Sequence, residues 1–423
     1  MLEKPKFFLT LKEFWLTMFV LTLLLFARLF FLYQDYVEFK AKPFYYTDVQ
    51  VLQAYEKYNG EAYYTILKLY APSLDLNFFS RTKIRAKEIN AKLRLKLFPH
   101  KKMTFFDYLG TSFMFSKVNK IYEDEHNLKS DALIFVEKQH DNEMIASFYK
   151  AIYFATPLDK TLRKQVSSLG FSHLIALSGF HLAILSALLF FLLRPLYRFF
   201  QQRYFPYRFD LYDMGFFILL ILAWYVWFVD APPSLVRSYA MMAVSWLLLI
   251  LGVELLSFTF LMSIVLLLLV IFPKMLLSLA FWLSVSGVFY IFLLLKHFSK
   301  FNKYAMTLFI SFGIFLLMLP IVHLVFPVVN PWQLSSPFLS LGFSLFYPLS
   351  MSLHLLGVGN LFDALLVKLF TLSTNEHTFL LPLKYGILYL FLSLWASYSK
   401  KIFYLLLVLS FAFTIWLFMG FWV

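Results

Sequence analysis

The sequence has 423 residues, of which 61% are hydrophobic and 15% are charged, with a net charge of +14 and no cysteine. Soluble domains are roughly half apolar and a quarter charged, so this composition excludes a soluble globular protein and indicates a membrane protein. The lack of cysteine excludes a disulfide framework for any part outside the membrane.

Ten stretches are long and apolar enough to cross a bilayer, whose core of about 30 Å needs about 20 residues per helix. They are residues 14–33, 173–193, 211–229, 235–251, 256–272, 277–295, 304–326, 334–356, 380–398 and 402–422. Segment 360–372 is too short and too amphipathic to count, and is compatible with a position along the membrane interface. We therefore expect about ten crossings, give or take about two.

The first apolar run is expected to stay in the protein as an anchor over residues 1–33. It is too long for the apolar part of a signal peptide, and no small-residue cleavage site follows it. Lys4, Lys6 and Lys12 precede it. The positive-inside bias then places the N-terminus in the cytoplasm and residues 34 to about 150 outside.

Residues 34–140 differ in composition from the rest, with charges, β-formers and turn signals. The stretch 49–70 predicts two strands joined by a tight hairpin at Asn59-Gly60. The stretches 82–88 and 91–98 alternate apolar and basic residues, which predicts two further strands, each with one apolar face. We expect a small β-barrel here.

The outward faces of the last two strands are basic. Their cations are Lys83, Arg85, Lys87, Lys92, Arg94 and Lys96, and the aromatic residues Phe98, Phe105, Phe106 and Tyr108 follow. Cations beside rings are typical of proteins that bind single-stranded nucleic acid without regard to sequence. Alternating charge equally marks any solvated strand face. The pattern alone leaves both interpretations open.

An amphipathic helix is predicted over 141–170, interrupted at Pro157, and it leads into the segment FSHLIALSGFH at 171–181. Polar side chains in a membrane span usually face a bundle interior or a cavity. His173, Ser178 and His181 therefore have three possible roles, which are helix packing, lining of a hydrated pore, or catalysis by a Ser178–His181 pair. Catalysis lacks an orienting carboxylate in this span, and a metal site lacks further ligands.

The same segment resembles the signature of the ComEC competence family. The matching residues are Gly170, His173, Leu174, Ala176, Ser178, Gly179 and His181. Two later segments resemble family elements in the same order. The first matches through Pro233, Arg237 and Met241 or Met242, and the second through Pro273, Phe281, Leu283 and Ser284.

This resemblance implies a channel that passes one DNA strand across the inner membrane during natural transformation. It also implies an OB-type domain after the first span. The expected architecture is a polytopic α-helical membrane protein with an OB-like periplasmic domain at 34–140 and a channel domain at 141–423, whose helix bundle starts at 171. The expected channel residues are Gly170, His173, Ser178, Gly179, His181, Pro233, Arg237, Phe281 and Ser284.

Many members of the family continue into a metallo-β-lactamase-like domain. This chain ends in an apolar run and has no His-x-His-x-Asp motif, so we expect no nuclease activity, no enzyme activity, no cofactor and no metal. No P-loop is present, so we expect a cytoplasmic helicase as partner. A periplasmic DNA-binding competence protein, membrane lipids and a separate nuclease complete the expected partners. Two alternatives stay open, a transporter of small solutes or lipids and an intramembrane hydrolase.

Overall fold

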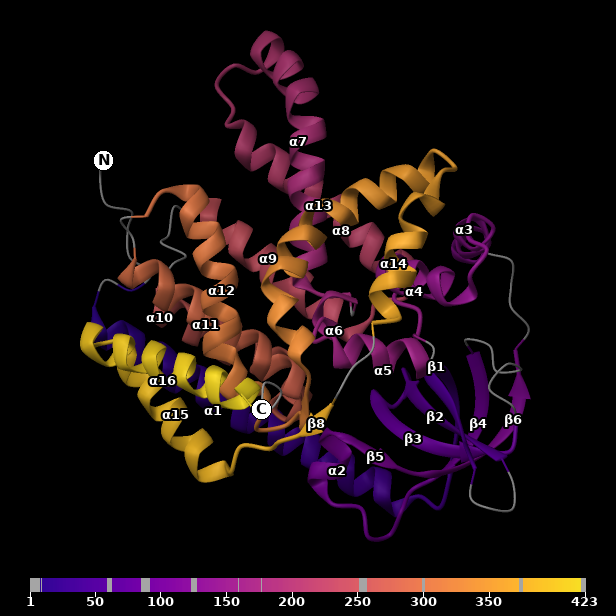
Figure 1. Ribbon diagram of the computed structural model, residues 1–423. Helices are drawn as coiled ribbons and strands as arrows, with labels where there is room; N and C mark the ends of the chain where they lie inside the picture. The colour runs from indigo at the N-terminus through magenta and orange to yellow at the C-terminus, as the bar shows by residue number, and fades with distance from the viewer. Residues whose placement is uncertain are drawn as a thin grey trace. The chain divides into compact units, whose positions relative to one another are not determined.

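The computed structural model describes residues 8, 10–58, 63–84, 92–122, 128–158, 160–175, 177–250, 257–298, 301–372 and 376–419. The chain forms two compact units (Figure 1). One unit contains residues 8–128 and 261–281 and is built around a β-sheet. The other contains residues 129–260 and 282–423 and is helical.

The sheet of the first unit has six strands in the order β5-β3-β2-β1-β4-β6. They are β1 (Tyr45–Tyr58), β2 (Tyr63–Ala71), β3 (Leu76–Thr82), β4 (Lys92–Phe98), β5 (Thr111–Phe113) and β6 (Phe115–Ile121). All described pairings are antiparallel except β3 with β5. The predicted pairing of the first two strands is confirmed by Tyr58 opposite Tyr63, while Asn59 and Gly60 lie outside the described residues.

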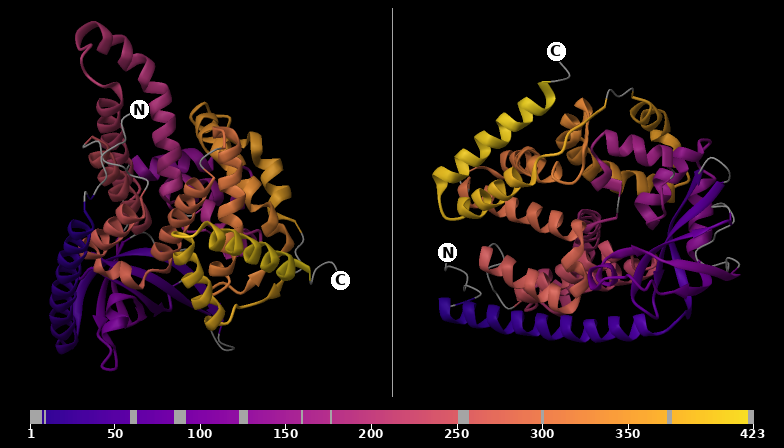
Figure 2. Two further views of the ribbon diagram at one scale, coloured as in Figure 1. Left: turned by 90° about the vertical axis from the view of Figure 1, so that its left-hand side faces the viewer. Right: turned by 90° about the horizontal axis from the view of Figure 1, so that it is seen from below.

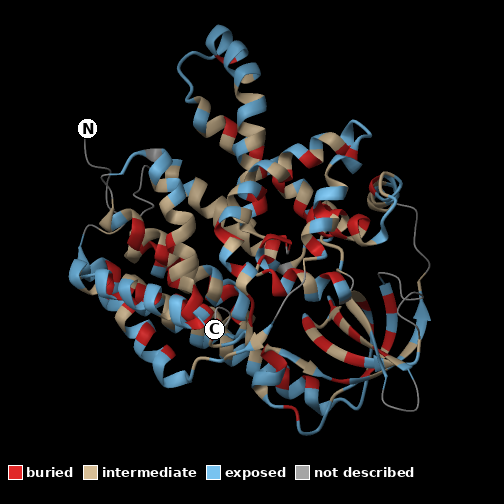
Figure 3. Cartoon of the chain, viewed as in Figure 1, coloured by how far each residue is buried: buried red, intermediate tan, exposed pale blue. Residues whose placement is uncertain are grey.

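The expected alternation in β4 is confirmed. Leu93, Leu95 and Leu97 have no exposed surface, and the residues between them point outward, as the banding of the strands in Figure 3 shows. The strand expected at 82–88 is wrong where it can be compared, because β3 ends at Thr82 and Lys83 begins a bend. The ladder itself is open, with β5 and β6 as its outer strands.

Helix α1 (Leu11–Ala41) extends beyond the C-terminal limit of the predicted anchor and joins the sheet core at its end. Tyr36 and Phe39 are buried there, and the Tyr36 hydroxyl donates to the Met103 carbonyl at 2.6 Å. The rest of α1 exposes apolar side chains, and Figure 2 shows it as one long helix at the indigo end of the chain. Such a surface suits lipid.

The short helix α2 (Phe105–Leu109) closes one end of this core. Thr104 and Asp107 form a capping box, in which the backbone N–H of Thr104 donates to the Asp107 carboxylate at 2.9 Å. That hydrogen bond holds the pKa of Asp107 below its usual value, because it stabilises the ionised carboxylate. The box fixes where the chain turns toward β5.

The turn between two apolar helices also belongs to this unit. It is the 3-10 helix η2 (Pro273–Leu277), which follows α10 (Phe258–Ile271). Lys274 donates to the carbonyl and, at 2.9 Å, to the carboxylate of Asp75, and its ammonium lies 5.5 Å from the ring centre of Tyr108. The α10–α11 connection is thereby attached to the β2–β3 turn.

The remaining elements are mostly helices that the sequence predicted as apolar or amphipathic, except over residues 128–137, which lie in the stretch 34–140 expected to form the barrel domain. They are α3 (Leu128–Glu137), α4 (Glu143–Phe154), α5 (Lys160–Ser168), α6 (Ser172–Ile175), α7 (Gly179–Tyr204), α8 (Asp210–Phe228), α9 (Pro233–Ile250), α11 (Leu279–His297), α12 (Lys303–Val322), α13 (Ser336–Leu355), α14 (Asp363–Phe370), α15 (Leu383–Ala396) and α16 (Lys400–Met419). Two further 3-10 helices, η3 (Pro331–Ser335) and η4 (Gly359–Phe362), flank α13, and two short strands, β7 (Val328–Val329) and β8 (His377–Thr378), pair with each other.

Seven helices in the described chain are long and apolar enough to span a membrane. They are α1, α7, α8, α11, α12, α13 with η3, and α16. The apolar helices α9, α10 and α15 are shorter. Helices α7 and α8 form an antiparallel hairpin that projects from its own unit (Figures 1 and 2). The chain is therefore a multi-pass α-helical membrane protein.

Candidate functional site

The FSHLIALSGFH segment forms a break between two helices. Helix α6 ends at Ile175 and α7 begins at Gly179, with Ser178 in extended backbone conformation as its N-cap. The Ser178 hydroxyl accepts from the Phe180 N–H at 3.3 Å, and the Ser178 N–H donates to Nδ1 of His181 at 3.3 Å. Histidine here takes the place that Glu or Gln holds in the usual capping box.

Two glycines allow neighbouring elements to approach this break closely. Gly170 has φ +76, and a Cβ there would lie 2.8 Å from Cγ of Gln333 in η3. A Cβ on Gly179 would lie 3.1 Å from the Ser238 hydroxyl of α9. The motif glycines are therefore needed for packing, and at Gly170 also for backbone conformation.

Both motif histidines face α13. Nε2 of His173 lies 3.3 Å from the Ser340 hydroxyl. His181 has no exposed surface and packs edge-on against Phe343 and Tyr347 at ring-centre distances of 5.3 and 4.9 Å. Nε2 of His181 has no hydrogen-bond partner among the described residues.

Helix α9 packs on the other side of the break. The Ser234 hydroxyl donates to the Leu177 carbonyl at 2.9 Å, which satisfies a backbone acceptor that the helix break leaves open. Arg237 follows less than one turn later and is partly buried. Pro233 is the first residue of α9.

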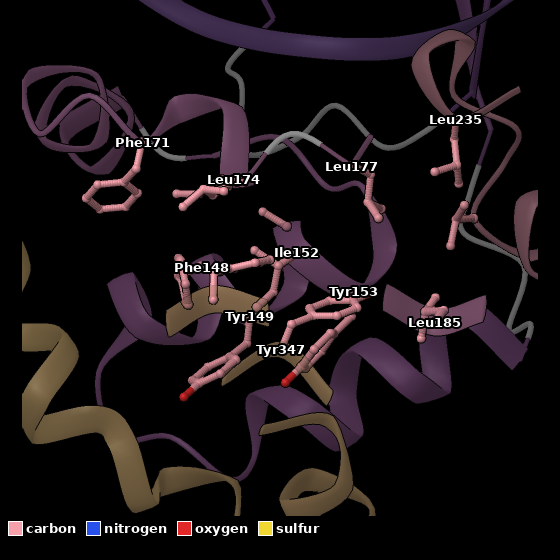
Figure 4. Packing of buried hydrophobic residues seen from close by; sticks show 14 of the residues in the cluster. Phe148, Tyr149, Ile152, Tyr153, Phe171, Leu174, Leu177, Leu185, Leu235 and Tyr347 are labelled. Atoms are coloured by element: carbon pink, nitrogen blue, oxygen red, sulfur yellow. The ribbon is translucent and has the colours of Figure 1, made fainter. Parts of the chain in front are cut away.

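Apolar side chains surround the break, as Figure 4 shows. Leu174, Leu177 and Leu185 belong to one cluster with Tyr153 of α4 and Tyr347 of α13. The polar groups thus lie within an apolar bundle, where a group without a partner is costly. Helix packing accounts for the Ser178 cap, and the orphaned nitrogen of His181 is the feature that packing does not explain.

Two of the expected channel residues lie on α11, not on the helices that form the break. Phe281 is buried but belongs to the sheet unit. Ser284 is exposed on α11. Among the described residues no group of three or more His, Asp or Glu side chains is placed to hold a metal ion.

The sheet carries a second candidate site on the outward faces of β4 and β6. Lys92 and Arg94 are exposed there, and Lys96 lies 3.8 Å from the ring centre of Phe44. The register of β4 with β6 adds two exposed cations, because Arg94 is opposite Lys120 and Lys96 is opposite Lys117. We call Lys92, Arg94, Lys96, Lys117 and Lys120 the basic face.

Exposed rings lie on β4 and β6 and also on β1 and β5. They are Tyr46, Phe98, Phe113 and Phe115, and Phe98 is opposite Phe115 in the β4–β6 register. One carboxylate, Asp48, is opposite Arg94 on β1 and accepts from the Tyr122 hydroxyl at 2.9 Å. Of the earlier candidates, Lys83 lies in the bend after β3, and Arg85 and Lys87 lie outside the described residues.

The match of residues 155–423 to the family described as competence protein covers the helix break and all later helices. No curated protein and no solved structure matches the chain. The break, its two glycines and its two histidines all lie within the matched part, whereas the basic face lies before it. The matched part is more than half of the sequence, and the chain therefore belongs to the competence protein family.

Proposed function

We propose that the protein is a channel for single-stranded DNA across the cytoplasmic membrane during natural transformation. Membership of the competence protein family indicates a role in DNA uptake, and it is the observation that carries the proposal. A channel for single-stranded DNA is a more specific function than a role in DNA uptake. It is supported by the basic face with its exposed rings, and by the polar helix break within the apolar bundle.

A polyanion cannot cross lipid without a hydrated route. A single strand carries a phosphate about every 3.4 Å at the closest, so a core of about 30 Å holds up to about nine negative charges. Arg237, partly buried beside the broken helix, is the cation that we assign to this route. Irregular backbone at membrane depth is tolerated where it lines such a cavity.

We further propose that the sheet acts as an OB-like barrel. Its two outer strands, β5 and β6, are consecutive in the chain and are separated only by Met114. The Met114 N–H donates to the Phe79 carbonyl of β3 at 2.8 Å, and Ser80 of β3 lies 2.7 Å from Ser116 of β6 through their hydroxyls. One continuous segment thus runs from one outer strand to the other, and both outer strands contact β3.

The path of the chain between α12 and α15 bears on the number of crossings. The β7–β8 pairing joins residues 328–329 to 377–378. The Leu381 N–H donates to the His323 carbonyl at 2.8 Å, and the Tyr389 hydroxyl donates to the Leu317 carbonyl at 2.8 Å. Helix α15 therefore starts beside the end of α12 and runs antiparallel to it.

The other end of α15 meets the end of α11. Lys296 donates to the Ser397 carbonyl at 2.7 Å, and the His297 ring lies 3.0 Å from the Ala396 carbonyl. A full crossing by α13 would need a return crossing before β8. Helix α14 has eight residues and spans only about 12 Å, which is too short.

We propose that η3, α13, η4 and α14 form a re-entrant segment, which enters and leaves the membrane on the extracytoplasmic side. The crossings are then α1, α7, α8, α9, α10, α11, α12, α15 and α16, which lies within the range expected from the sequence. This path puts Lys400 and Lys401 in the cytoplasm together with Lys296. If α13 crossed the membrane, Lys400 and Lys401 would lie outside, which the positive-inside bias disfavours.

Cysteine labelling tests this path, since the chain has no native cysteine. Lys400→Cys is expected to react with a membrane-impermeant maleimide only after the cells are permeabilised. The control Lys101→Cys, exposed next to β4, is expected to react in intact spheroplasts. Reaction of Lys400→Cys in intact spheroplasts would rule out the re-entrant path but would not contradict the proposal of a DNA channel.

Ser178→Ala separates a channel from a hydrolase. Removing an N-cap hydroxyl costs about 1 kcal/mol, so we expect slightly lower thermal stability and nearly unchanged transformation. A hydrolase that uses Ser178 as nucleophile would lose all activity. Transformation frequency per cell, normalised to the amount of protein in the membrane, is the measurement.

Deleting the gene tests the function itself. We expect labelled DNA to reach the periplasm and to fail to arrive in the cytoplasm. Normal transformation by the deletion strain would refute the proposal and favour a solute or lipid transporter. The same assay, repeated in strains that lack a cytoplasmic helicase or a periplasmic DNA-binding competence protein, tests the proposed partners.

A further inference from the structure

Three titratable side chains join the far end of the re-entrant segment to the α3–α4 connection. Nδ1 of His140 lies 2.8 Å from an oxygen of Asp363, the first residue of α14. Nε2 of His140 lies 2.9 Å from Nε2 of His354, in the last turn of α13. Nδ1 of His354 lies 2.7 Å from the Ser350 carbonyl oxygen. The His140 side chain has no exposed surface.

These three hydrogen bonds fix the number of protons that the group holds. Each bond needs one hydrogen, so the three bonds need three. A carbonyl oxygen only accepts, which places one hydrogen on Nδ1 of His354. Two neutral imidazoles and an ionised carboxylate carry only two hydrogens between them. One bond therefore needs a proton from outside, whichever of the three groups carries it.

The surroundings hold the three groups in place. The Tyr149 ring stacks on the His140 ring at 4.6 Å, and the Tyr153 hydroxyl lies 3.4 Å from Nδ1 of His354 while it donates to Ser350. Gln139 donates to the His354 carbonyl and accepts from the Gly359 N–H. Nearby, Lys150 and Glu137 pair with each other at 2.9 Å.

Gly359 allows the His354 ring and the Gln139 side chain to pack closely against the backbone. A Cβ there would lie 2.6 Å from the His354 ring and 2.7 Å from Oε1 of Gln139. The imidazoles therefore have little room to separate when a proton leaves. Two bare ring nitrogens would then face each other at 2.9 Å, or the hydrogen bond to Ser350 or Asp363 would break.

We infer that Asp363, His140 and His354 form a binding site for one proton, which fastens the α13–α14 segment to the α3–α4 connection. The site is neutral when the proton is bound, because one positive imidazolium balances the carboxylate. Loss of the proton leaves an uncompensated negative charge on the partly exposed Asp363 and one broken hydrogen bond. The attachment of α14 therefore weakens as the pH rises. The inference stands whether or not the chain conducts DNA.

Asp363→Asn is the decisive variant. An asparagine amide donates to Nδ1 of His140, so two neutral imidazoles then satisfy all three hydrogen bonds without an added proton. We expect the thermal midpoint of the full-length wild type in lipid nanodiscs to fall, relative to this variant, as the pH rises from about 6.5 to about 9. Tryptophan fluorescence reports the midpoint.

The direction of this pH dependence follows from the number of protons that the folded and unfolded states bind. The folded protein binds one more proton than the unfolded chain above about pH 6.5, the ordinary histidine value, so rising pH favours unfolding. One proton changes the unfolding equilibrium constant by up to about tenfold per pH unit. Asp131→Asn, an exposed change on α3, is the matched control and is expected to follow the wild type.

Parallel curves for the wild type and Asp363→Asn would overturn the inference. Should Asp363→Asn fail to fold, histidine ¹⁵N NMR of the wild type gives the answer directly. At about pH 8, where an ordinary histidine is neutral, we expect one imidazole signal with both nitrogens protonated or one protonated carboxyl. Only neutral imidazoles and ionised carboxylates at that pH would refute the site.

Discussion

Replacing the five cations of the basic face by alanine is expected to lower the affinity for single-stranded DNA and to flatten its dependence on salt. Each phosphate contact adds about 0.7 to the slope of log affinity against log salt on single strands, so five contacts add up to about 3.5. All five side chains lie on the outward faces of β4 and β6. Anisotropy of a labelled oligonucleotide on the full chain in nanodiscs measures both quantities.

The double variant Lys117→Ala/Lys120→Ala isolates the part of the face that only the β4–β6 register reveals. It should reduce the slope by about 1.4. Its matched control, Lys101→Ala/Lys102→Ala, removes two exposed lysines next to β4 and keeps the basic face intact. Equal slopes for the two double variants would mean that the cations only keep the strands soluble.

The salt slope also separates phosphate contacts from base stacking. The rings beside the cations, Phe98 and Phe115, are opposite each other and exposed. Stacking contributes about 1–3 kcal/mol per base and releases no counterions. Replacing a ring should therefore weaken DNA binding without changing the salt slope, whereas replacing a cation of the basic face should change both.

The parts of the fold that depend on local pattern were predictable. Strand β4 alternates leucine with Lys or Arg, and the apolar helices are long runs between charges. Period and composition are properties of a few neighbouring residues, so a sequence displays them. The strand prediction is wrong at Lys83 and Ile84, which form a bend, because alternation over a few residues is also compatible with a bend.

Features that depend on distant residues were not predictable. Lys117 and Lys120 are three residues apart in β6, and only the irregular pairing with β4 places them opposite Lys96 and Arg94. The bond between His140 and Asp363 joins residues 223 positions apart. Hydropathy predicts α13 as a crossing, and the proposal of a re-entrant path rests on the β7–β8 pairing, which joins residues far apart in the chain.

The helix break was predictable only in part. The sequence indicated that Ser178 has a role in helix packing, pore lining or catalysis, and the structure has Ser178 as N-cap. The partner of the cap was not predicted, because His181 stands where Glu or Gln usually completes the box. The resemblance pointed to these positions, and the cap explains physically why a serine and a histidine occur three residues apart.

Gly170→Ala is expected to destabilise the helical unit by about 2–5 kcal/mol and to abolish transformation. The left-handed φ of +76 costs a residue with a Cβ about 1–2 kcal/mol. The new Cβ would also meet Gln333 at 2.8 Å, and overpacking of this kind costs about 1–3 kcal/mol. The thermal midpoint of the purified protein and its amount in the membrane measure the loss.

Gly342→Ala on α13 is the matched control, because a Cβ there meets no atom within 4 Å. In a helix interior alanine is favoured over glycine by about 0.5–1 kcal/mol, so this variant should be as stable as the wild type or slightly more stable. Equal stability of Gly170→Ala and Gly342→Ala would show that η3 does not pack on the start of the helix break. A second-site change of Gln333 to alanine should recover part of the packing loss in Gly170→Ala and none of the backbone strain, since it removes Cγ but leaves φ unchanged.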